Sequence, residues 1–431
     1  MAVDPWRSNE QDHPFDRRAL AGGTLAAALA AVGGAGTAGA AVPIRGTFTP
    51  VDPVRVLDTR DGTGVADRRV GPLGAGQVIE LHVSGVGGVP ATGAGAVVLN
   101  VTATGSTDAG FVTVYPCGQP RPLASNLNFR RGADVANQVT AKIGDGGDVC
   151  LFTAVRTDLV ADLSGWYTDD FAAVPGFFYE QLTPARVIDT RDGTGLGARP
   201  AGQLAAGEVL ALTVAGTGGV PADADVRAVT MNVTATGATE GGFLTVFPCD
   251  RPRPWTSNVN VEAGSSTVAN LATSRVSAAG QVCFYAAVPT DLVVDLQGYF
   301  SPTASASFNP MSPVRVLDTR DGTGVVDSRP ARLRAGEVIE VQVAGLNGVP
   351  ADARAVLLNV TITDAAGAGY VTAWPCGQPR PLASFLNHVR GVDRANLTPV
   401  RVGDGGKVCL FVHASTEAVA DLNGYYSPVA V

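Results

Sequence analysis

The segment Asp58–Gly64 reads DTRDGTG, and the same seven letters return at Asp189–Gly195 and Asp318–Gly324. The three copies start 131 and 129 residues apart. Solenoid repeats are about 20–50 residues long, so this interval indicates a duplicated domain instead. A chain of 431 residues accommodates about three domains of roughly 100–200 residues each. The heptapeptide therefore divides the chain into three repeats.

The composition favours all-β domains. The chain has 53 glycines, 28 prolines and 16% charged residues, and runs of Val, Thr and Ala alternate with Gly- and Pro-containing turns. In the first repeat this pattern predicts eight strands, at PVRVLDT, VIELHV, AVVLNVTAT, FVTVYPC, SNLNF, NQVTAKI, VCLFTA and LVADLSGWY. Strands so spaced are typical of antiparallel sandwiches and jelly rolls. We therefore expect three tandem antiparallel β-sandwich or jelly-roll-like domains in a semi-rigid row, over 48–168, 169–300 and 301–429.

Residues 1–40 have the features of a cleaved export signal peptide. Arg17-Arg18 precedes a weakly apolar, glycine-containing stretch from Ala19 to Ala41, and Ala38-Gly39-Ala40 matches a small-x-small cleavage site. The paired arginines favour twin-arginine (Tat) export, with Sec export as the alternative. We expect a secreted, soluble protein that is extracellular or associated with the cell wall.

Six cysteines are spread evenly over the repeats. Each repeat has one pair, separated by 33, 34 and 33 residues. Thiolate metal sites need CxxC spacing or nearby histidines, and neither occurs here, so we predict no metal site at the cysteines. We predict one disulfide within each repeat: Cys117–Cys150, Cys249–Cys283 and Cys376–Cys409.

A set of short motifs recurs in every repeat. Their order is P-x-R-V-[LI]-D-T-R, G-G-V-P or a near form, N-V-T, P-C-x-x-P-R-P, S-[NF]-x-N, A-N and a closing D-L-x-G-[WY]-[YF]. This series, from Phe48 to about Pro428, resembles a tandem repeat module of secreted actinobacterial proteins. The resemblance implies a companion module, found in tandem or beside cell-wall and polysaccharide hydrolases. It does not specify an activity.

The heptapeptide itself has three interpretations. Alternation along the preceding strand places Asp58 and Arg60 on one face and Arg55 on the other. An arginine beside a carboxylate at a strand end can pair with it and hold the following turn, so the first interpretation is a polar clasp that closes the sandwich. The alternatives are a calcium site and a ligand-binding loop. The residues concerned are Asp58, Arg60, Asp61, Asp189, Arg191, Asp192, Asp318, Arg320 and Asp321.

Catalysis is not favoured by the sequence. The histidines after the signal, at 82, 388 and 413, have no histidine at the equivalent positions of the other repeats, and GxSxG, HExxH and Walker motifs are absent. Paired carboxylates remain the less favoured enzymatic reading, since a glycoside hydrolase needs only two. Each repeat adds one aspartate in its last strand, which we expect to be buried and bonded to a loop or to the DTR arginine: Asp162, Asp295 and Asp421. We predict no catalytic residue and no cofactor.

Other shared residues are expected to be structural. The asparagines of N-V-T are expected to bond to neighbouring backbone and those of A-N to loop carbonyls: Asn100, Asn232 and Asn359, then Asn137, Asn270 and Asn396. The aromatic residue before each Pro-Cys is expected in the core: Tyr115, Phe247 and Trp374.

Aromatic pairs that close the repeats are the best hint of binding. Consecutive strand residues face opposite ways, so one ring of each pair is free to stack on sugar unless the next domain covers it: Trp166, Tyr167, Tyr299, Phe300, Tyr425 and Tyr426. A formal charge of −8 without a Lys/Arg-rich run argues against nucleic acid and against a basic membrane surface. The sequence thus favours a non-catalytic multivalent binder of cell-envelope or environmental glycan. The alternative is a structural or adhesive surface protein whose repeats act as spacers or self-assemble.

Overall fold

The computed structural model describes residues 45–222, 225–264, 267–325, 328 and 330–429. The predicted export signal at 1–40 lies outside these residues. Every repeat contains eight strands, and all strand pairings are antiparallel. The prediction of antiparallel sandwich domains, each with one disulfide, is confirmed.

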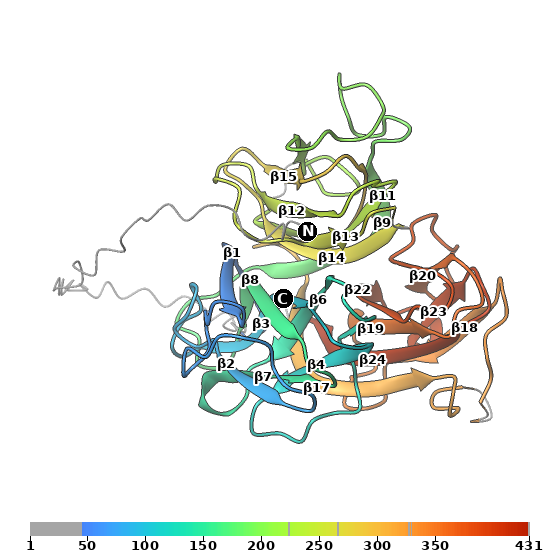
Figure 1. Ribbon diagram of the computed structural model, residues 1–431. Helices are drawn as coiled ribbons and strands as arrows, with labels where there is room; N and C mark the ends of the chain where they lie inside the picture. The colour runs from blue at the N-terminus through green and yellow to red at the C-terminus, as the bar shows by residue number, and fades with distance from the viewer. Residues whose placement is uncertain (1–44, 223–224, 265–266, 326–327, 329, 430–431) are drawn as a thin grey trace, which may run out of the picture. The chain divides into compact units, whose positions relative to one another are not determined.

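Each repeat folds as two facing four-stranded sheets (Figure 1). In repeat 1 the inner sheet has the order β1-β8-β3-β6 and the outer sheet β2-β7-β4-β5. The bounds are β1 Phe48–Asp58, β2 Val78–His82, β3 Ala94–Thr104, β4 Gly110–Pro116, β5 Leu127–Phe129, β6 Val135–Lys142, β7 Asp148–Thr153 and β8 Asp158–Thr168. A short 3-10 helix, η1 (Asp145–Gly147), precedes β7.

Repeats 2 and 3 keep the same strand orders. Repeat 2 consists of β9 Phe178–Asp189, β10 Val209–Thr213, β11 Ala228–Thr236, β12 Gly242–Pro248, β13 Val259–Val261, β14 Val268–Arg275, β15 Gln281–Ala286 and β16 Asp291–Ser301. Repeat 3 consists of β17 Ala306–Asp318, β18 Val338–Gln342, β19 Ala355–Thr363, β20 Gly369–Pro375, β21 Leu386–His388, β22 Arg394–Arg401, η3 Asp404–Gly406, β23 Lys407–Val412 and β24 Glu417–Pro428. A pairing of Ala306 with Tyr179 joins the inner sheets of these two repeats.

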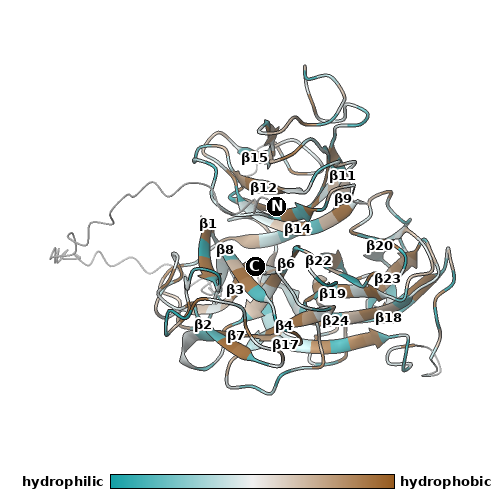
Figure 2. Cartoon of the chain, in the orientation of Figure 1, coloured by the Kyte–Doolittle hydropathy of each residue, from teal (hydrophilic) through white to brown (hydrophobic). Residues whose placement is uncertain are grey.

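Outer-sheet strands follow the alternation expected of a sheet with one buried face. In β4, Val112 and Val114 lie in the core between the sheets, whereas Phe111 and Tyr115 point to the opposite face. Inner-sheet strands differ, because β3 is buried over nearly its whole length. Strand β24 of the third repeat is likewise buried over most of its length, and the hydropathy along these strands can be followed in Figure 2.

The second face of each inner sheet is covered by the other repeats. Strands β6, β14 and β22 contact one another, and one further apolar core contains residues of all three repeats. Residues 44–431 accordingly form one compact unit. The expectation of three beads in a row is therefore wrong: apolar side chains on both faces of the inner strands require a second partner, and the neighbouring repeats supply it.

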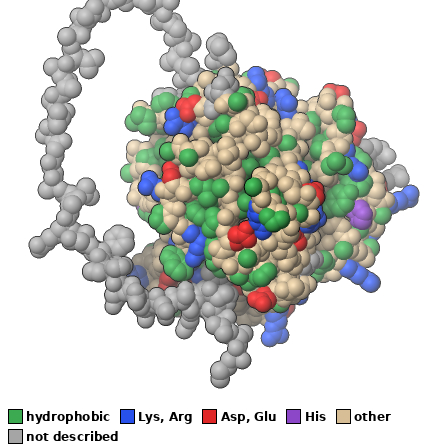
Figure 3. Space-filling model, turned by 90° about the horizontal axis from the view of Figure 1, so that it is seen from above, with side chains coloured by type: hydrophobic (Ala, Val, Ile, Leu, Met, Phe, Trp, Pro, Cys, Tyr) green, Lys and Arg blue, Asp and Glu red, His purple; other side chains and the backbone are tan. Residues whose placement is uncertain are grey.

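Charged side chains of both signs are intermixed with apolar ones on the face shown in Figure 3. This distribution differs from the basic stripe of a nucleic-acid-binding surface. Among the described residues, no helix is long and apolar enough to cross a membrane.

Candidate functional site

The DTRDGTG segments form buried ionic clasps. Asp58 is 2% exposed, and its Oδ1 accepts hydrogen bonds from the backbone N–H and the Nε of Arg60, at 3.1 and 2.9 Å. Its Oδ2 accepts from Arg60 Nη2 at 2.6 Å and from Arg55 Nη1 at 3.1 Å. Burial opposes ionisation, but the bonds and charge of Arg60, assisted by Arg55, outweigh it and hold the pKa of Asp58 below its usual value. The same contacts recur at Asp189 with Arg191 and Arg186, and at Asp318 with Arg320 and Arg315.

The rest of the heptapeptide is a tight turn. The N–H of Asp58 donates to Thr63 O and the N–H of Gly62 donates to Asp58 O, both at 2.9 Å, while exposed Asp61 accepts from the N–H of Thr63. Gly64 has a φ of +69°, and a Cβ there would lie 1.8 Å from Val56 O. Only glycine fits this position. With both Asp58 oxygens held by guanidinium groups, the loop is poorly suited to calcium, and its geometry is that of a clasp.

The arginine that pairs with the aspartate of the last strand is not the DTR arginine, although Asp421 also accepts from the backbone of Ser125, a loop residue, which is the other partner expected. Asp162 accepts from Arg55 Nε at 2.9 Å and Arg55 Nη2 at 3.3 Å, so its arginine is that of P-x-R-V and not that of DTR. A register shift between Arg55 and Leu57 breaks the alternation and brings Arg55 to both aspartates, contrary to the predicted opposite faces. Equivalent contacts join Arg186 to Asp295 and Arg315 to Asp421.

These carboxylates are poor candidates for acid–base catalysis. Asp58 and Asp162 are both buried and share Arg55. Burial raises the pKa of Asp162, although the charge and hydrogen bond of Arg55 act in the opposite direction. A glycosidase pair needs room for a sugar and a water between the carboxylates, whereas here the guanidinium group of Arg55 occupies that space.

Two clasp arginines also donate a hydrogen bond to a loop of a neighbouring repeat. Arg55 Nη2 donates to Trp255 O at 3.0 Å, and Arg315 Nη2 donates to Leu123 O at 2.7 Å. Trp255 and Leu123 occupy the same position of the P-R-P loop in their repeats. Each of these clasps therefore closes its own sandwich and holds a loop of a neighbour.

The shared asparagines link the repeats in a closed ring. Asn270 Nδ2 donates to Asn100 Oδ1 at 2.9 Å, and Asn100 Nδ2 donates to the neighbouring repeat's Ser257 O at 2.6 Å. The other two links are Asn396 to Asn232 at 3.1 Å and Asn137 to Asn359 at 2.9 Å. The A-N asparagines donate to loop carbonyls of their own repeats, as predicted. The N-V-T asparagines donate to carbonyls of another repeat and not to neighbouring backbone, which corrects the prediction made for them.

The closing aromatic residues are not a sugar-stacking surface. The second ring of each pair, in Tyr167, Phe300 and Tyr426, is buried in the core shared by the repeats. There the rings alternate with Phe48, Tyr179 and Phe308 in a closed chain of contacts, with centroid distances of 4.3–5.0 Å. The first rings pack inside their own repeats: Trp166, Tyr299 and Tyr425. The predicted stacking role is therefore wrong, because the other repeats cover these strands.

The disulfides lie on the outer face of the outer sheets. Cys117–Cys150, Cys249–Cys283 and Cys376–Cys409 are bonded as predicted. Tyr115 and Trp374 are buried, but they pack against the disulfides in small clusters apart from the main cores. Glu340 approaches the third disulfide, whose cysteines have no free thiolate to offer a metal.

Beside each disulfide lies a partly exposed surface that sequence reasoning missed. Arg121 stacks over the ring of Phe152, with 3.8 Å between guanidinium carbon and ring centroid, and Phe111 packs against that ring at 5.9 Å. We call these three residues and their equivalents the outer-face patches: Arg121, Phe111 and Phe152; Arg253, Phe243 and Tyr285; Arg380, Tyr370 and Phe411. The recurrent Arg of P-C-x-x-P-R-P and the aromatic residue two positions after the second cysteine were the available signals.

Repeat 2 extends its patch with a tryptophan. The side chain of Trp255 is 72% exposed and lies 5.1 Å from the guanidinium carbon of Arg253. The other repeats have leucines there, Leu123 and Leu382, which are also exposed. A large apolar side chain thus projects beside each patch.

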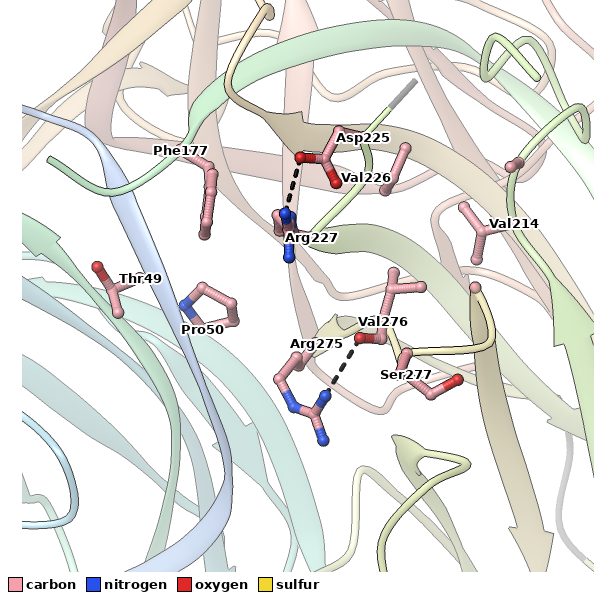
Figure 4. A pocket seen from close by; sticks show the side chains of 13 residues that line it. Thr49, Pro50, Phe177, Val214, Asp225, Val226, Arg227, Arg275, Val276 and Ser277 are labelled. Carbon is pink, nitrogen blue, oxygen red and sulfur yellow. Dashed lines mark hydrogen bonds and ion pairs between the residues drawn. The ribbon is translucent and has the colours of Figure 1, made fainter. Parts of the chain in front are cut away.

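Grooves lie at joints between the repeats. One of about 510 Å³ is lined by Thr49 and Pro50 of repeat 1 and by Arg227 and Arg275 of repeat 2 (Figure 4). Arg227 is paired with Asp225. Arg275 is bound by Asp52, Asp250 and the carbonyl of Val276. Arg275 thus joins repeat 2 to repeat 1 through Asp52, and Arg227 is paired within repeat 2. Both guanidinium groups of the groove already have acceptors in the protein.

No family model and no curated protein sequence matches this chain. Solved structures similar to it include one of Sulfolobus turreted icosahedral virus, at 9% identity over 82% of this chain and 84% of that chain. Another, of an archaeal virus with a triple jelly roll fold and turret assembly, has 9% identity over 90% of both chains. A third, the tandem CBM22-1–CBM22-2 domain of Paenibacillus barcinonensis Xyn10C, has 10% identity over 59% of this chain and 94% of that chain. The TM-score is 0.17 in each case, too low to indicate a function.

Proposed function

We propose that this protein is a secreted, non-catalytic, multivalent binder of cell-envelope or environmental glycan, and that the outer-face patches are its binding sites. The observation that carries the proposal is an arginine stacked on a half-buried or nearly buried aromatic ring at the same position of all three repeats. Membership of the secreted actinobacterial repeat module belongs to the same proposal.

The chemistry of the patches suits sugars. Carbohydrate rings present apolar C–H faces to aromatic side chains and hydroxyl oxygens to hydrogen-bond donors, and binding sites combine such apolar area with a few placed polar groups. Arg121 and Arg380 make no hydrogen bond or ion pair with other described residues, so their guanidinium N–H groups remain available. Stacking on the ring fixes the guanidinium plane without using those donors.

Three equivalent sites in one compact unit favour a polymeric ligand. On a polymer, tethered sites of modest affinity gain about 10²–10⁴ in avidity when they engage together. The asparagine ring and shared aromatic core fix the patches relative to one another, so little ordering entropy is lost on the second and third contacts.

Retention on insoluble peptidoglycan, chitin and cellulose tests the proposal. We expect the mature chain to be retained on at least one of them, and the triple variant R121A/R253A/R380A to lose most of that retention. The matched control is R69A/R156A/R334A, which removes the same charge from exposed arginines outside the patches. Equal retention of both variants would refute the assignment of the patches, and no retention of the parent chain would refute glycan binding.

A second function is favoured by the sheet edges. Strands β2, β10 and β18 are edge strands of the outer sheets, and each exposes a valine, Val78, Val209 and Val338, by 43%, 48% and 46%. Exposed edges with apolar side chains are templates for pairing with another chain. A self-assembling surface protein would form concentration-dependent oligomers in light scattering that V78K/V209K/V338K abolishes, and it would not be retained on glycan.

A further inference from the structure

A polar cavity near the starts of β6, β14 and β22 is lined by residues of all three repeats. Its volume is about 320 Å³, and its lining includes Arg130 and Asp134 of repeat 1, Asn260 and Glu262 of repeat 2, and Arg394 of repeat 3. We call it the axial cavity, because the central strands β6, β14 and β22 begin beside it. At about 30 Å³ per water it has room for roughly ten waters, or for one small polar ligand.

Two of its polar side chains have no hydrogen-bond partner among the described residues. Asn260 is 7% exposed, and neither its side-chain nitrogen nor its oxygen makes a hydrogen bond. Half-buried Arg394 makes no ion pair or hydrogen bond with other described residues. Buried polar groups ordinarily make hydrogen bonds. The Asn260 amide and the Arg394 guanidinium therefore have unused hydrogen-bonding groups, most of which are donors that need an acceptor.

The acidic residues of the cavity do not bond to Arg394 or Asn260, because they have other partners. Glu262 is held by Arg130, and Asp134 accepts from the hydroxyl of Thr104. Burial and the charge of Arg130 lower the pKa of Arg394, as expected for a partly buried cation that lies near another cation. An anion in the cavity would relieve this cost.

Arg394 also departs from the internal repeat. The segments that open β6, β14 and β22 read VAN, VAN and RAN, so Val135 and Val268 stand where repeat 3 has Arg394. Two of the three copies fold with valine at this position, and the arginine is therefore not required by the strand. It occurs once per chain, in contrast to the threefold outer-face patches.

We propose that the axial cavity binds the carboxylate of one acidic sugar, with Arg394 and Arg130 facing the carboxylate and the Asn260 amide facing a hydroxyl. The class of sugar rests on the proposed glycan-binding function, while the carboxylate rests on the cavity alone. One such site per chain gives the protein a preference for acidic glycans, which the outer-face patches do not supply.

Calorimetric titration of the full mature chain with glucuronate, glucose and acetate tests this inference. We expect one glucuronate per chain, with glucose and acetate weaker by about tenfold or more, since a hydrogen bond to a charged group is worth about 1.5–3 kcal/mol. R394V should lose glucuronate by a similar factor and unfold at the parent's temperature, because valine is the residue of the other repeats. R394K should retain part of the affinity.

Several outcomes would overturn the axial site: three equivalents bound, unchanged affinity in R394V, equal affinity for glucose, or no binding because the cavity holds only water. The two proposals fail separately. If R121A/R253A/R380A still binds glucuronate but the parent chain is retained on no polymer, the axial site is supported and the assignment of the outer-face patches is refuted. If retention depends on the patches and R394V binds glucuronate like the parent, the patches are supported and the axial site is refuted.

Discussion

Replacement of Asp58 by asparagine tests whether DTRDGTG is a clasp. Asp58 accepts four hydrogen bonds from two arginines whose side chains are largely buried. Asparagine keeps one acceptor oxygen and places an NH₂ group where the other accepted from Arg55 and Arg60. Two charge-assisted bonds are lost, each worth about 1.5–3 kcal/mol net, and some solvent reaches the arginines and screens the loss. We expect D58N to lower the free energy of unfolding by about 2–4 kcal/mol at pH 7.

The pH dependence gives this prediction a second check. The folded-state pKa of Asp58 is depressed, so its contribution is present above the unfolded value of about 3.9 and is lost as pH falls through the folded value. The gap between parent and D58N should therefore be full at pH 7 and should shrink below about pH 4.

Urea unfolding followed by tryptophan fluorescence measures both effects, because Trp166 and Trp374 are buried. The matched control is D61N, in the same heptapeptide: Asp61 is exposed and only accepts from the N–H of Thr63, which an asparagine oxygen also does. We expect its midpoint to equal the parent's. Equal losses in D58N and D61N, or a D58N gap that does not change with pH, would refute the clasp.

Three further predictions concern the turn, the ring and the disulfides. G64A should destabilise the protein far more than G132A. Both glycines have nearly the same φ, +69° and +68°, which costs an L-residue about 1–2 kcal/mol, but only Gly64 faces a carbonyl oxygen. Similar urea midpoints for the two variants would contradict this prediction. N270L should cost about 1–3 kcal/mol by leaving Asn100 Oδ1 and the N–H of Gln138 without partners. Calorimetry of the parent should show the repeats unfolding in one transition, whereas three separate transitions would disprove the coupling between repeats. Each disulfide closes a loop of 33 or 34 residues and should contribute about 3–4 kcal/mol to the free energy of unfolding. Mass mapping of non-reduced peptides should find no cysteine pair that joins two repeats.

Local physical chemistry made much of the fold readable from the sequence. Strand alternation, Gly/Pro turns and one cysteine pair per repeat depend on residues close in sequence or within one repeat, so the eight strands, the two-sheet sandwich and the disulfide pairs could be predicted. The pairing of Asp58 with Arg60 could be predicted for the same reason, since the two are i and i+2 neighbours.

Only the tertiary structure decided how the repeats meet. The partner of Asp162 depended on a bulge between Arg55 and Leu57, which alternation does not reveal. The closing aromatic residues and the asparagines looked like surface or local features because their partners lie more than 100 residues away, in other repeats. A repeated sequence specifies each copy equally well, whether the copies stand in a row or close on one another. What selects the closed arrangement is the free energy of burying the second apolar face of each inner sheet, and that term exists only when the three copies are together.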